Sequence, residues 1–400
     1  MTFKELSELL KKRSYGGKKG NLSLLKQTAK KLGVLPVPYK TVLVAGTNGK
    51  GTVAHLLAQT AIKSGIKTGL FISPHIFDIR ERISVNNKEI SQKDFCKCLE
   101  KVLFVEVKPL KFFELLTLSA LVYFKEKKVD FAVFECGIGG LKDSTNIIDS
   151  DLSIITSVAK DHENLLGNTL EKIAAQKAGI IKKEKPCILG QVSPKILKII
   201  EDTCIKKNAP LIMPVCQNIK LDFLKNKTEF TCQNKKYSIN MLGKKAAQNG
   251  ALVILASNIL DFNKGLTKAF LKIALPTRFE IKKINKNYLI QDGAHNPAAI
   301  KEFLNTFVKS PYFKQENILV YGVSKEKDYK TCAKLLSPYF KKICLVEFEK
   351  SCPKDELKKY FKNCVFLDVK DLAKTKANII QVGSFYLSCE LKKYLSKKQL

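Results

Sequence analysis

The stretch that most constrains the fold is residues 41–52, Thr-Val-Leu-Val-Ala-Gly-Thr-Asn-Gly-Lys-Gly-Thr. It opens with an apolar run, Val42–Val44, typical of a buried parallel strand, and the residues from Val53 onward carry apolar side chains at helical spacing. Three glycines and Lys50 lie between these segments. Backbone N–H groups of such a turn and the N-terminus of the next helix bind phosphate oxygens, while the lysine supplies the counter-charge. The pattern predicts a phosphate-binding loop in an α/β domain.

The predicted phosphate loop departs from the usual pattern at one position. A hydroxyl residue normally follows the lysine directly, whereas Gly51 stands there and Thr52 comes one residue later. The alternative interpretation is a glycine-rich turn beside a surface lysine. The strand before the turn and the helix after it favour the phosphate loop.

The net charge, +33 over 400 residues, raises the hypothesis of a basic nucleic-acid-binding P-loop ATPase. The basic residues are nearly all lysines, because arginine occurs only at positions 13, 80, 82 and 278. Nucleic-acid and phosphate interfaces favour the arginine guanidinium, and the lysines are spread along the whole chain. We therefore expect no nucleic-acid partner, and we attribute the charge to composition, with some benefit for attracting polyanionic substrates.

The cysteine pattern indicates a protein of a reducing compartment, and the hydropathy of the chain indicates that it does not span a membrane. The 12 cysteines are scattered without paired spacings, so buried thiols are expected in place of disulfides or a zinc site. The N-terminus lacks the apolar core of a signal peptide, and no run of 18 apolar residues occurs. We expect a cytoplasmic protein with no membrane partner.

Polar side chains follow several predicted strands at the points where those strands end. They are Ser73, Pro74 and His75 after residues 68–72, Glu135 after 129–134, Asp161 and His162 after 151–157, and Asp292 and His295 after 288–291. Ligands of open parallel sheets bind at this edge. A carboxylate beside a glycine loop, downstream of a phosphate loop, is also typical of a magnesium ligand. One such residue alone is more often structural, but several together favour a converging site.

Two domains are predicted, 1–275 and 276–400, joined by a linker at 276–280. The fold class is α/β: a P-loop mononucleotide-binding domain with a central, mostly parallel sheet, followed by a smaller Rossmann-like domain. Helices are expected at 3–33 with a break near 15–20, and at 111–124, 169–180, 242–256, 297–308 and 329–339. The helix 169–180 carries Lys177, which on such a polar surface would ordinarily be solvated. Residues 186–240 contain no motif that predicts a functional site.

These segments, in this order, resemble the folylpolyglutamate synthase/dihydrofolate synthase family of the Mur ligase superfamily. The resemblance runs from about Gly20 to Phe385. Its motifs are residues 46–52, 73–75, 81–83, 135–140, 143–146, 156–157, 161–162, 177–180, 278–280, 292–297 and 383–385. Two positions depart from the family pattern: Leu141 replaces an arginine and Lys244 replaces a histidine.

The resemblance implies an ATP-dependent acid–amino-acid ligase. In the family, ATP phosphorylates the carboxylate of dihydropteroate or the γ-carboxylate of (tetrahydro)folate, and the amine of L-glutamate then displaces phosphate. The implied cofactors are ATP and Mg²⁺ at two sites, with K⁺ as a further candidate, and the implied oligomeric state is a monomer. Residues 276–400 would form the glutamate ligase domain, and closure about 276–278 would exclude water from the acyl phosphate.

The resemblance also carries roles over to individual residues of this sequence. The ATP contacts are Gly46, Thr47, Asn48, Gly49, Lys50, Gly51, Thr52, Val53, Asn249, Arg278 and Asp292. The metal ligands are Thr52, Ser73, Glu135 and His162. The pterin or folate pocket comprises Gly20, Asn21, Leu22, Ser23, Pro74, Lys111, Phe112, Phe113, Glu114, Asp143 and Ser144. The catalytic group consists of Lys50, His162, Lys177, Asp292 and His295, with Lys177 carbamylated.

A cell-wall Mur ligase acting on a UDP-muramoyl peptide would share this architecture. Gly51 and residues 143–146 favour the folate branch instead. Dihydrofolate synthase and folylpolyglutamate synthase activities use one catalytic apparatus, so the sequence is compatible with either or both.

Overall fold

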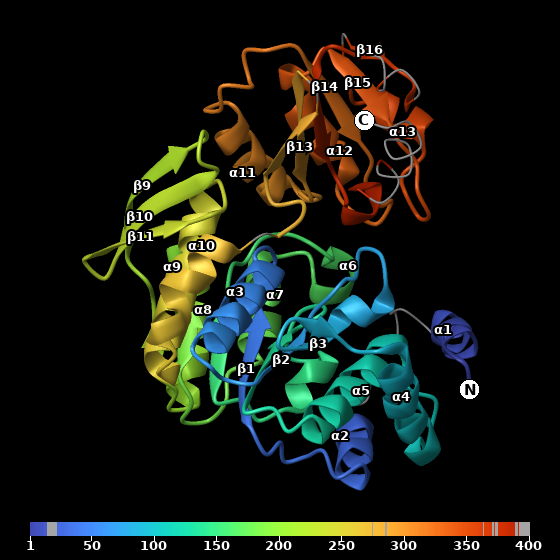
Figure 1. Cartoon of the computed structure of the whole chain (residues 1–400), viewed down its shortest axis with the longest axis vertical. Helices are drawn as coiled ribbons and strands as arrows, with labels where there is room; N and C mark the ends of the chain where they lie inside the picture. Colours follow the sequence, from blue (N-terminus) through green and yellow to red (C-terminus); the bar gives the residue numbers. More distant parts are fainter. Residues whose placement is uncertain are drawn as a thin grey trace. The chain divides into compact units, whose positions relative to one another are not determined.

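The structure is a computed structural model that describes residues 1–13, 22–273, 275–284, 286–362, 364–369, 372, 375–388 and 391 (Figure 1). Contacts within the chain group it into two compact units. Unit 1 comprises Met1–Ala159, Glu163–Val215 and Gln248–Phe270, and unit 2 comprises Lys160–His162, Cys216–Ala247 and Leu271–Leu400. The chain crosses between the units several times, and the single boundary near residue 275 stays a prediction.

The main sheet of unit 1 has eight strands in the order β4-β3-β2-β5-β1-β6-β7-β8. Their bounds are β1 Lys40–Ala45, β2 Thr68–Phe71, β3 Ile83–Val85, β4 Lys88–Glu89, β5 Phe131–Glu135, β6 Leu152–Ile155, β7 Cys187–Leu189 and β8 Leu211–Ile212. The neighbouring strands β2, β5, β1, β6, β7 and β8 pair in parallel. Only the pairs β2 with β3 and β3 with β4 are antiparallel. The prediction of a central, mostly parallel sheet is confirmed.

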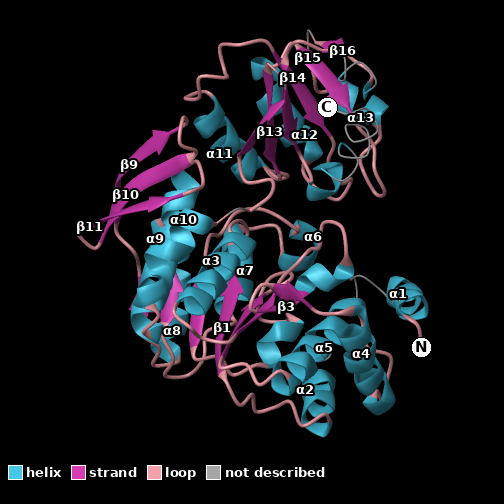
Figure 2. Cartoon of the chain, viewed as in Figure 1, coloured by secondary structure: helices cyan, strands magenta, loops and turns pink. Residues whose placement is uncertain are grey.

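The helices of unit 1 cover both faces of this sheet (Figure 2). They are α1 Phe3–Lys12, α2 Leu22–Lys31, α3 Lys50–Lys63, α4 Gln92–Val105, α5 Phe112–Glu126, α6 Glu163–Leu166, α7 Leu170–Ala178 and α8 Pro194–Lys206, with short 3₁₀ turns at Ile79–Arg82, Ser144–Ile147 and Asn263–Gly265. Two further helices, α9 Lys244–Leu260 and α10 Leu266–Lys272, include residues of both units.

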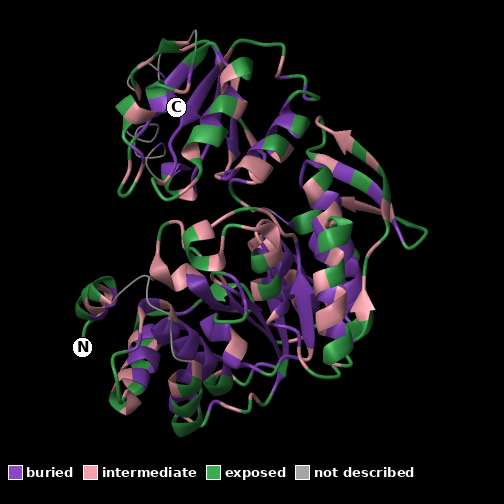
Figure 3. Ribbon diagram, turned by 180° about the vertical axis from the view of Figure 1, so that it is seen from behind, coloured by how far each residue is buried: buried purple, intermediate pink, exposed green. Residues whose placement is uncertain are grey.

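Burial on both faces explains the sequence of the central strands. Every residue of β5 is buried, as is every residue of β1 after Lys40 (Figure 3). Leu43 and Ala45 alternate along β1 and join a core cluster with side chains of α4 and α5. Helix α3 also packs against β1 and β5. A strand that is covered on both faces has a continuous run of apolar residues. This is why the run Val42–Val44 predicted a buried strand.

Unit 2 contains two sheets. A three-stranded antiparallel sheet has the order β11-β10-β9, and a six-stranded sheet has the order β12-β13-β17-β14-β15-β16. The strands are β9 Cys216–Asp222, β10 Lys227–Cys232, β11 Lys235–Ile239, β12 Glu280–Ile284, β13 Asn287–Asp292, β14 Asn317–Tyr321, β15 Lys342–Leu345, β16 Val365–Phe366 and β17 Asn378–Val382. Its helices include α11 Pro297–Phe307, α12 Tyr329–Leu336 and α13 Lys354–Lys358, with a 3₁₀ turn at Ser337–Tyr339. All pairs of the larger sheet are parallel except β12 with β13.

Most predicted elements occur within a few residues of their expected bounds. The prediction missed β12, which starts inside the expected linker, and it did not distinguish the sheet β9–β11 in the lysine- and asparagine-rich stretch. The cysteines in the described part of the chain are all free thiols, as predicted. Among the described residues, no helix combines the length and the apolar character needed to cross a bilayer.

Candidate active site

The phosphate loop, residues 46–52, joins β1 to α3 through two glycines with positive φ. The angle is 153° at Gly46 and 89° at Gly49, which is the N-cap of α3. A Cβ on Gly46 would lie 1.9 Å from Oγ1 of Thr156, and a Cβ on Gly49 would lie 2.7 Å from Oδ1 of Asn249. Both positions therefore require glycine, for conformation and for space.

The segment after β6 holds the phosphate loop in place. The N–H groups of Thr47 and Asn48 donate to the backbone O (2.9 Å) and the Oγ (3.0 Å) of Ser157. The hydroxyls of Thr156 and Ser157 donate in turn to the O of Asn48, at 2.7 and 2.9 Å. The Thr47 hydroxyl donates to the O of Ala159 and accepts from its N–H, both at 3.0 Å. Because β1 and β6 are parallel neighbours, segments more than 100 residues apart meet at one sheet edge.

Lys50, the first residue of α3, folds its side chain back onto the loop. Its Nζ donates to the O of Gly46 at 3.1 Å and to the O of Thr47 at 3.3 Å. The ammonium group is thus fixed beside the helix N-terminus, where the partial positive charge of the helix also lies. This is the arrangement in which a lysine neutralises terminal phosphates.

Glu135, the last residue of β5, is a carboxylate only 3% exposed beside the phosphate loop. Its Oε2 accepts the N–H of Ser73 at 3.0 Å and would lie 3.4 Å from a Cβ on Gly51. Thr52 is buried one residue further along α3. The glycine that breaks the usual pattern therefore faces this carboxylate, and a Cβ at position 51 would be in van der Waals contact with it.

Lys177 is buried at the end of α7, with 2% of its surface exposed, although a lysine on such a helix is ordinarily solvated. The glycine loop 137–140 packs against this turn: a Cβ on Gly140 would lie 2.8 Å from the O of Gln176 and 3.1 Å from the O of Lys177. The N–H of Leu141 donates to the O of Gln176 at 2.6 Å. The backbone at Gly140 thus packs closely against the end of α7, a helix whose sequence pattern predicts a mostly polar surface.

Asp143 and Ser144 lie in the loop after the glycine segment, and the Asp143 carboxylate is used within that loop. It accepts the N–H of Ile138 at 3.0 Å, and the N–H and hydroxyl of Thr145 at 3.0 and 2.7 Å. Burial raises the pKa of the Asp143 carboxyl, and these hydrogen bonds oppose the rise. The Ser144 hydroxyl lies 2.9 Å from Oγ1 of Thr117 on α5. Asp143 therefore braces the loop.

The other predicted pocket residues lie at the starts of α2 and α5 and after β2. Gly20 and Asn21 fall outside the described residues, Leu22 and Ser23 begin α2, and Pro74 is exposed. The Lys111 N–H donates to Oε2 of Glu114 at 2.8 Å and caps α5. The Phe113 ring lies 5.4 Å from that of Phe71, and a Cβ on Gly137 would lie 2.8 Å from it.

Arg82 connects the loop after β2 to α5. Its Nε donates to Nδ1 of His75 at 2.8 Å, and its guanidinium lies 5.2 Å from the ring centroid of Phe112. Because arginine can only donate, Nδ1 of His75 carries no proton. Burial, followed by the charge of Arg82, lowers the pKa of His75 to about 4, so this imidazole is neutral at neutral pH.

Asp292 ends β13 in unit 2, and its carboxylate is held by its own loop. Oδ2 accepts the N–H of Phe279 at 3.0 Å, and Oδ1 accepts the N–H of Ala294 at 2.8 Å. Burial raises the pKa of Asp292 to about 6, and the charge of Arg278 opposes this shift. The Arg278 guanidinium lies 4.6 Å from the ring centroid of Phe385.

A polar cluster within unit 2, here called the Asp161 cluster, consists of Asp161, His162, His295, Asn296 and Lys327. The Lys327 Nζ lies 2.7 Å from Oδ1 of Asp161 and 2.9 Å from Nε2 of His162. Asn296 donates to Oδ2 of Asp161 at 3.2 Å, and Nε2 of His295 lies 3.8 Å from the same oxygen. Burial opposes ionisation of Asp161, but Lys327 and the two histidines outweigh it and hold the pKa of the carboxyl below its usual range. Burial and Lys327 lower the pKa of His295 to about 4.

Comparison with known proteins identifies the family to which this arrangement belongs. The Mur ligase middle domain model matches residues 44–257, more than half of the chain. The dihydrofolate synthase/folylpolyglutamate synthase of Bacillus subtilis is 32% identical over 356 residues, which cover 83% of this chain and 82% of that protein. The chain belongs to the dihydrofolate synthase/folylpolyglutamate synthase family. It is thus an ATP-dependent ligase of the acid–amino-acid class, as the resemblance implied.

Solved structures of the family share the fold over nearly the whole chain. The structure of Escherichia coli FolC in complex with DHPP and ADP has a TM-score of 0.88 and 26% identity, covering 100% of this chain and 99% of that one. The bifunctional folylpolyglutamate synthase/dihydrofolate synthase of Yersinia pestis, in complex with AMPPNP and a Mn ion, has a TM-score of 0.84 and 26% identity, covering 99% and 98%.

Within each unit of this family member, several predicted site residues meet. Unit 1 brings the phosphate loop together with Ser73, Glu135 and Asn249, and unit 2 brings Asp161, His162 and His295 together. Among the described residues, no three side chains of His, Cys, Asp or Glu are arranged to hold a metal ion. A metal beside Glu135 would therefore also need hydroxyl or phosphate oxygens.

The sequence analysis assigned no site role to two members of the Asp161 cluster: Asn296, which lies within the motif 292–297, and Lys327, whose segment fits the family pattern only loosely. Lys327 follows β14 in the same way that the predicted site residues follow their strands, and this signal could have identified it. Asn296 is the N-cap of α11 and accepts the N–H of Ala299 at 2.9 Å, so its side chain serves the helix as well as the cluster.

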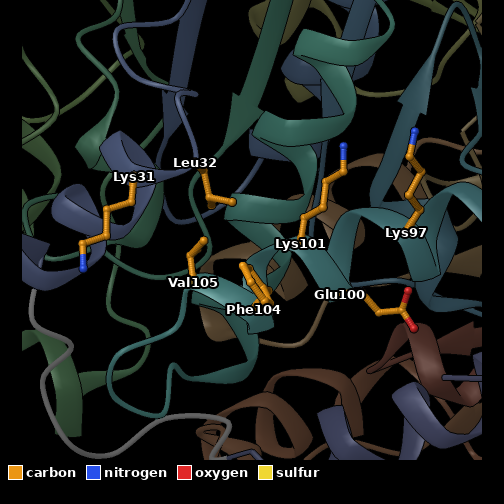
Figure 4. Close-up of a pocket in the computed structure, with 7 residues that line it drawn as sticks. All are labelled: Lys31, Leu32, Lys97, Glu100, Lys101, Phe104 and Val105. Carbon is orange, nitrogen blue, oxygen red and sulfur yellow. The ribbon is translucent and has the colours of Figure 1, made fainter.

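A surface groove of unit 1 contains none of the predicted site residues (Figure 4). It is lined by Lys31, Leu32, Lys97, Glu100, Lys101, Phe104 and Val105, at α2 and α4. Lys97 and Lys101 both pair with Glu126 there. The groove is therefore distinct from the residues that the family motifs mark.

Proposed function

We propose that the protein adds L-glutamate to dihydropteroate, to the γ-carboxylate of (tetrahydro)folate, or to both, through an acyl phosphate formed with ATP. The observation that carries the proposal is the buried Glu135 carboxylate facing Gly51 of a phosphate loop whose lysine is already fixed. The names of the Bacillus subtilis and Yersinia pestis relatives, which include both activities, support the bifunctional form.

The chemistry follows from the poor reactivity of a carboxylate toward an amine. Transfer of a phosphoryl group to the acid creates an acyl phosphate, and the glutamate amine then displaces phosphate through a tetrahedral intermediate. Negative charge accumulates on the phosphoryl oxygens during the first step, so fixed cations and N–H groups stabilise it. Lys50 and the backbone of residues 46–52 supply these groups in unit 1.

The donor set around Glu135 fits a divalent cation. A buried carboxylate and the hydroxyls of Ser73 and Thr52 are oxygen ligands of the kind that Mg²⁺ prefers, and Gly51 leaves room beside the carboxylate. Magnesium bound there would neutralise the charge of the transferred phosphate. The Mn ion in the Yersinia pestis structure supports a divalent metal. Two Mg²⁺ sites, one with Thr52 and the other with Ser73, Glu135 and His162, remain our proposal by resemblance, as does a K⁺ site.

We further propose that Lys177 is carbamylated. The side chain is buried, with 2% of its surface exposed, and a carbamate would turn it into an anion able to support magnesium. Lys177→Ala should lose at least about 100-fold in kcat, and added formate or acetate should restore part of the loss. Lys172→Ala, an exposed lysine of the same helix, is the control. Full activity of Lys177→Ala without rescue would contradict the carbamate.

The remaining assignments rest on the family motifs. Asn249, Arg278 and Asp292 are proposed to contact ATP, and the Asn249 amide beside Gly49 supports the first of these. Phe113 is proposed to stack on the pterin. The rest of the proposed pocket comprises Gly20, Asn21, Leu22, Ser23, Pro74, Lys111, Phe112, Glu114, Asp143 and Ser144. A monomeric, cytoplasmic enzyme without nucleic-acid or membrane partners completes the proposal.

The decisive experiment measures phosphate release from ATP with three acceptors in parallel. These are dihydropteroate plus L-glutamate, tetrahydrofolate plus L-glutamate, and a UDP-muramoyl peptide precursor with its amino acid. Turnover with the first two supports the bifunctional ligase, and turnover with one of them identifies the activity present. Turnover with only the UDP-muramoyl precursor would overturn the folate assignment.

A further inference from the structure

Lys327 is the lysine of the Asp161 cluster and belongs to no proposed ligand or substrate set. Its side chain is 12% exposed, and it lies between Oδ1 of Asp161 and Nε2 of His162, at 2.7 and 2.9 Å. The backbone of its loop is fixed too, because the N–H of Lys327 donates to Ser324 and its O accepts from Tyr329. The ammonium is therefore held at this position from both ends of the side chain.

Hydrogen-bond chemistry defines the state of the His162 ring. An ammonium group has only donors, so Nε2 of His162 accepts, and its lone pair points at Lys327. His162 also has a φ of 50°, a left-handed conformation that is uncommon outside glycine, and its N–H donates to Oδ1 of Asp161 at 2.9 Å. The backbone thus holds the ring toward the lysine.

An imidazole nitrogen has a single lone pair, so Nε2 of His162 cannot bind the Lys327 ammonium and a metal ion together. A divalent cation at that nitrogen would also be repelled by the adjacent positive charge. We propose that Lys327 is an internal cation that occupies the metal-binding nitrogen of His162, and that it must move away before a divalent cation binds there. This inference rests on the proposed function, because that function makes His162 a metal ligand.

The consequence is an order of events at His162: Lys327 leaves first, and a divalent cation binds afterwards. In the nucleotide-free enzyme, Lys327 neutralises Asp161 and blocks His162, so a divalent cation gains nothing from this imidazole. Lys327 is therefore a positioning residue that acts through His162 and does not need to touch the substrate.

The test is a Mn²⁺ titration of the nucleotide-free, full-length protein, followed by electron paramagnetic resonance. Lys327→Met should tighten Mn²⁺ binding by about tenfold, because a unit positive charge next to the site is removed. Lys325→Met, an exposed lysine of the same loop, should leave the affinity unchanged and controls for net charge. Thermal unfolding checks that each variant is folded, and Lys327→Gln provides a polar variant should the methionine variant not fold.

The gain must depend on His162. In a His162→Gln background, Lys327→Met should no longer tighten Mn²⁺ binding, and this double-mutant cycle isolates the pair. No gain in a folded Lys327→Met or Lys327→Gln protein would overturn the proposal. A gain that persists without His162 would also overturn it, because Asp161 would then be capturing the ion.

A separate titration distinguishes this failure from failure of the proposed function. If His162→Gln binds Mn²⁺ with AMPPNP as tightly as the unchanged protein, then His162 is not a ligand and the metal assignment itself fails. If His162→Gln weakens that binding while Lys327→Met has no effect, only the competition is wrong.

Discussion

The phosphate loop of unit 1 and the Asp161 cluster of unit 2 both gather charged groups at strand ends, but they are held differently. The loop is shaped by glycine conformations and by hydrogen bonds to one neighbouring segment, each of which joins a backbone group to a hydroxyl or to another backbone group. The cluster is held by side chains from three segments, with Lys327 and Asp161 separated by 166 residues. Backbone geometry fixes the first site, and charge balance between buried side chains fixes the second.

The two sites should therefore fail in different ways. A loop fixed by backbone contacts is sensitive to one added methyl group, while the rest of the fold tolerates it. A cluster of mutually neutralising groups is sensitive to loss of any one charge, because the partner is left buried and unpaired. Changes at the loop should mainly reduce nucleotide binding, and changes at the cluster should mainly reduce stability.

The largest effect is expected for Gly49→Ala. The new Cβ would meet Oδ1 of Asn249 at 2.7 Å in a left-handed backbone, so ATP affinity should fall at least about 100-fold. Gly65→Ala provides a matched control, because Gly65 has a similar φ of 87° with no atom within 4 Å of a Cβ. Gly65→Ala should lower the free energy of unfolding by only about 1 kcal/mol, because alanine is disfavoured in a left-handed backbone conformation. Equal nucleotide affinity in the two variants would show that loop packing is unimportant.

The next effect concerns the free energy of unfolding. Asp161→Asn should destabilise unit 2 by about 3 kcal/mol, because it leaves the nearly buried Lys327 without its carboxylate. Urea denaturation measures this loss. Glu229→Gln, which breaks the more exposed pair with Lys227 in the same unit, should cause a much smaller loss. Similar losses for both variants would contradict a special role for burial in the cluster.

A smaller effect is expected in the pH dependence of stability. The pKa of His295 is lowered to about 4 in the folded protein, against about 6.5 when unfolded. The stability from neutral His295 is thus complete above pH 6.5 and is lost as pH falls toward 4, by at most about 3 kcal/mol. Since 25% of the side chain is exposed, solvent screening reduces this limit.

Comparison of unfolding curves at pH 7 and pH 4.5 for the unchanged protein and His295→Gln checks the His295 contribution. The variant should show the shallower pH dependence. An identical slope for both proteins would mean that another group, such as the similarly shifted His75, carries the effect.

The smallest effect is expected in the surface groove. Phe104 is 91% exposed, so Phe104→Ser should change the free energy of unfolding by less than about 0.5 kcal/mol and leave kcat and KM unchanged. Steady-state kinetics and urea denaturation test both statements. A loss of ligase activity would show that the groove contributes to function and that the two strand-end regions do not account for it alone.

The sequence predicted the elements that have strong local signals. The apolar run before Gly46, the helix after Lys50 and the alternation of strands and helices in the last third all occur where the pattern placed them. The sheet β9–β11 was not distinguished because its strands carry many polar residues that are exposed or half-buried, as the burial pattern of β9 shows. Strand β12 was missed because it begins at Glu280, the last residue of the expected linker, and because two of its residues are lysines.

The amino-acid sequence by itself determined the glycine loop, the α/β class and the family, because local conformational preference and ordered motifs carry that information. Only the tertiary structure decided that Lys177 is buried, that Asp143 braces its own loop, and that Lys327 meets His162. Burial and the pairing of distant side chains depend on how parallel strands bring their ends together, and no local pattern records which partner will be there.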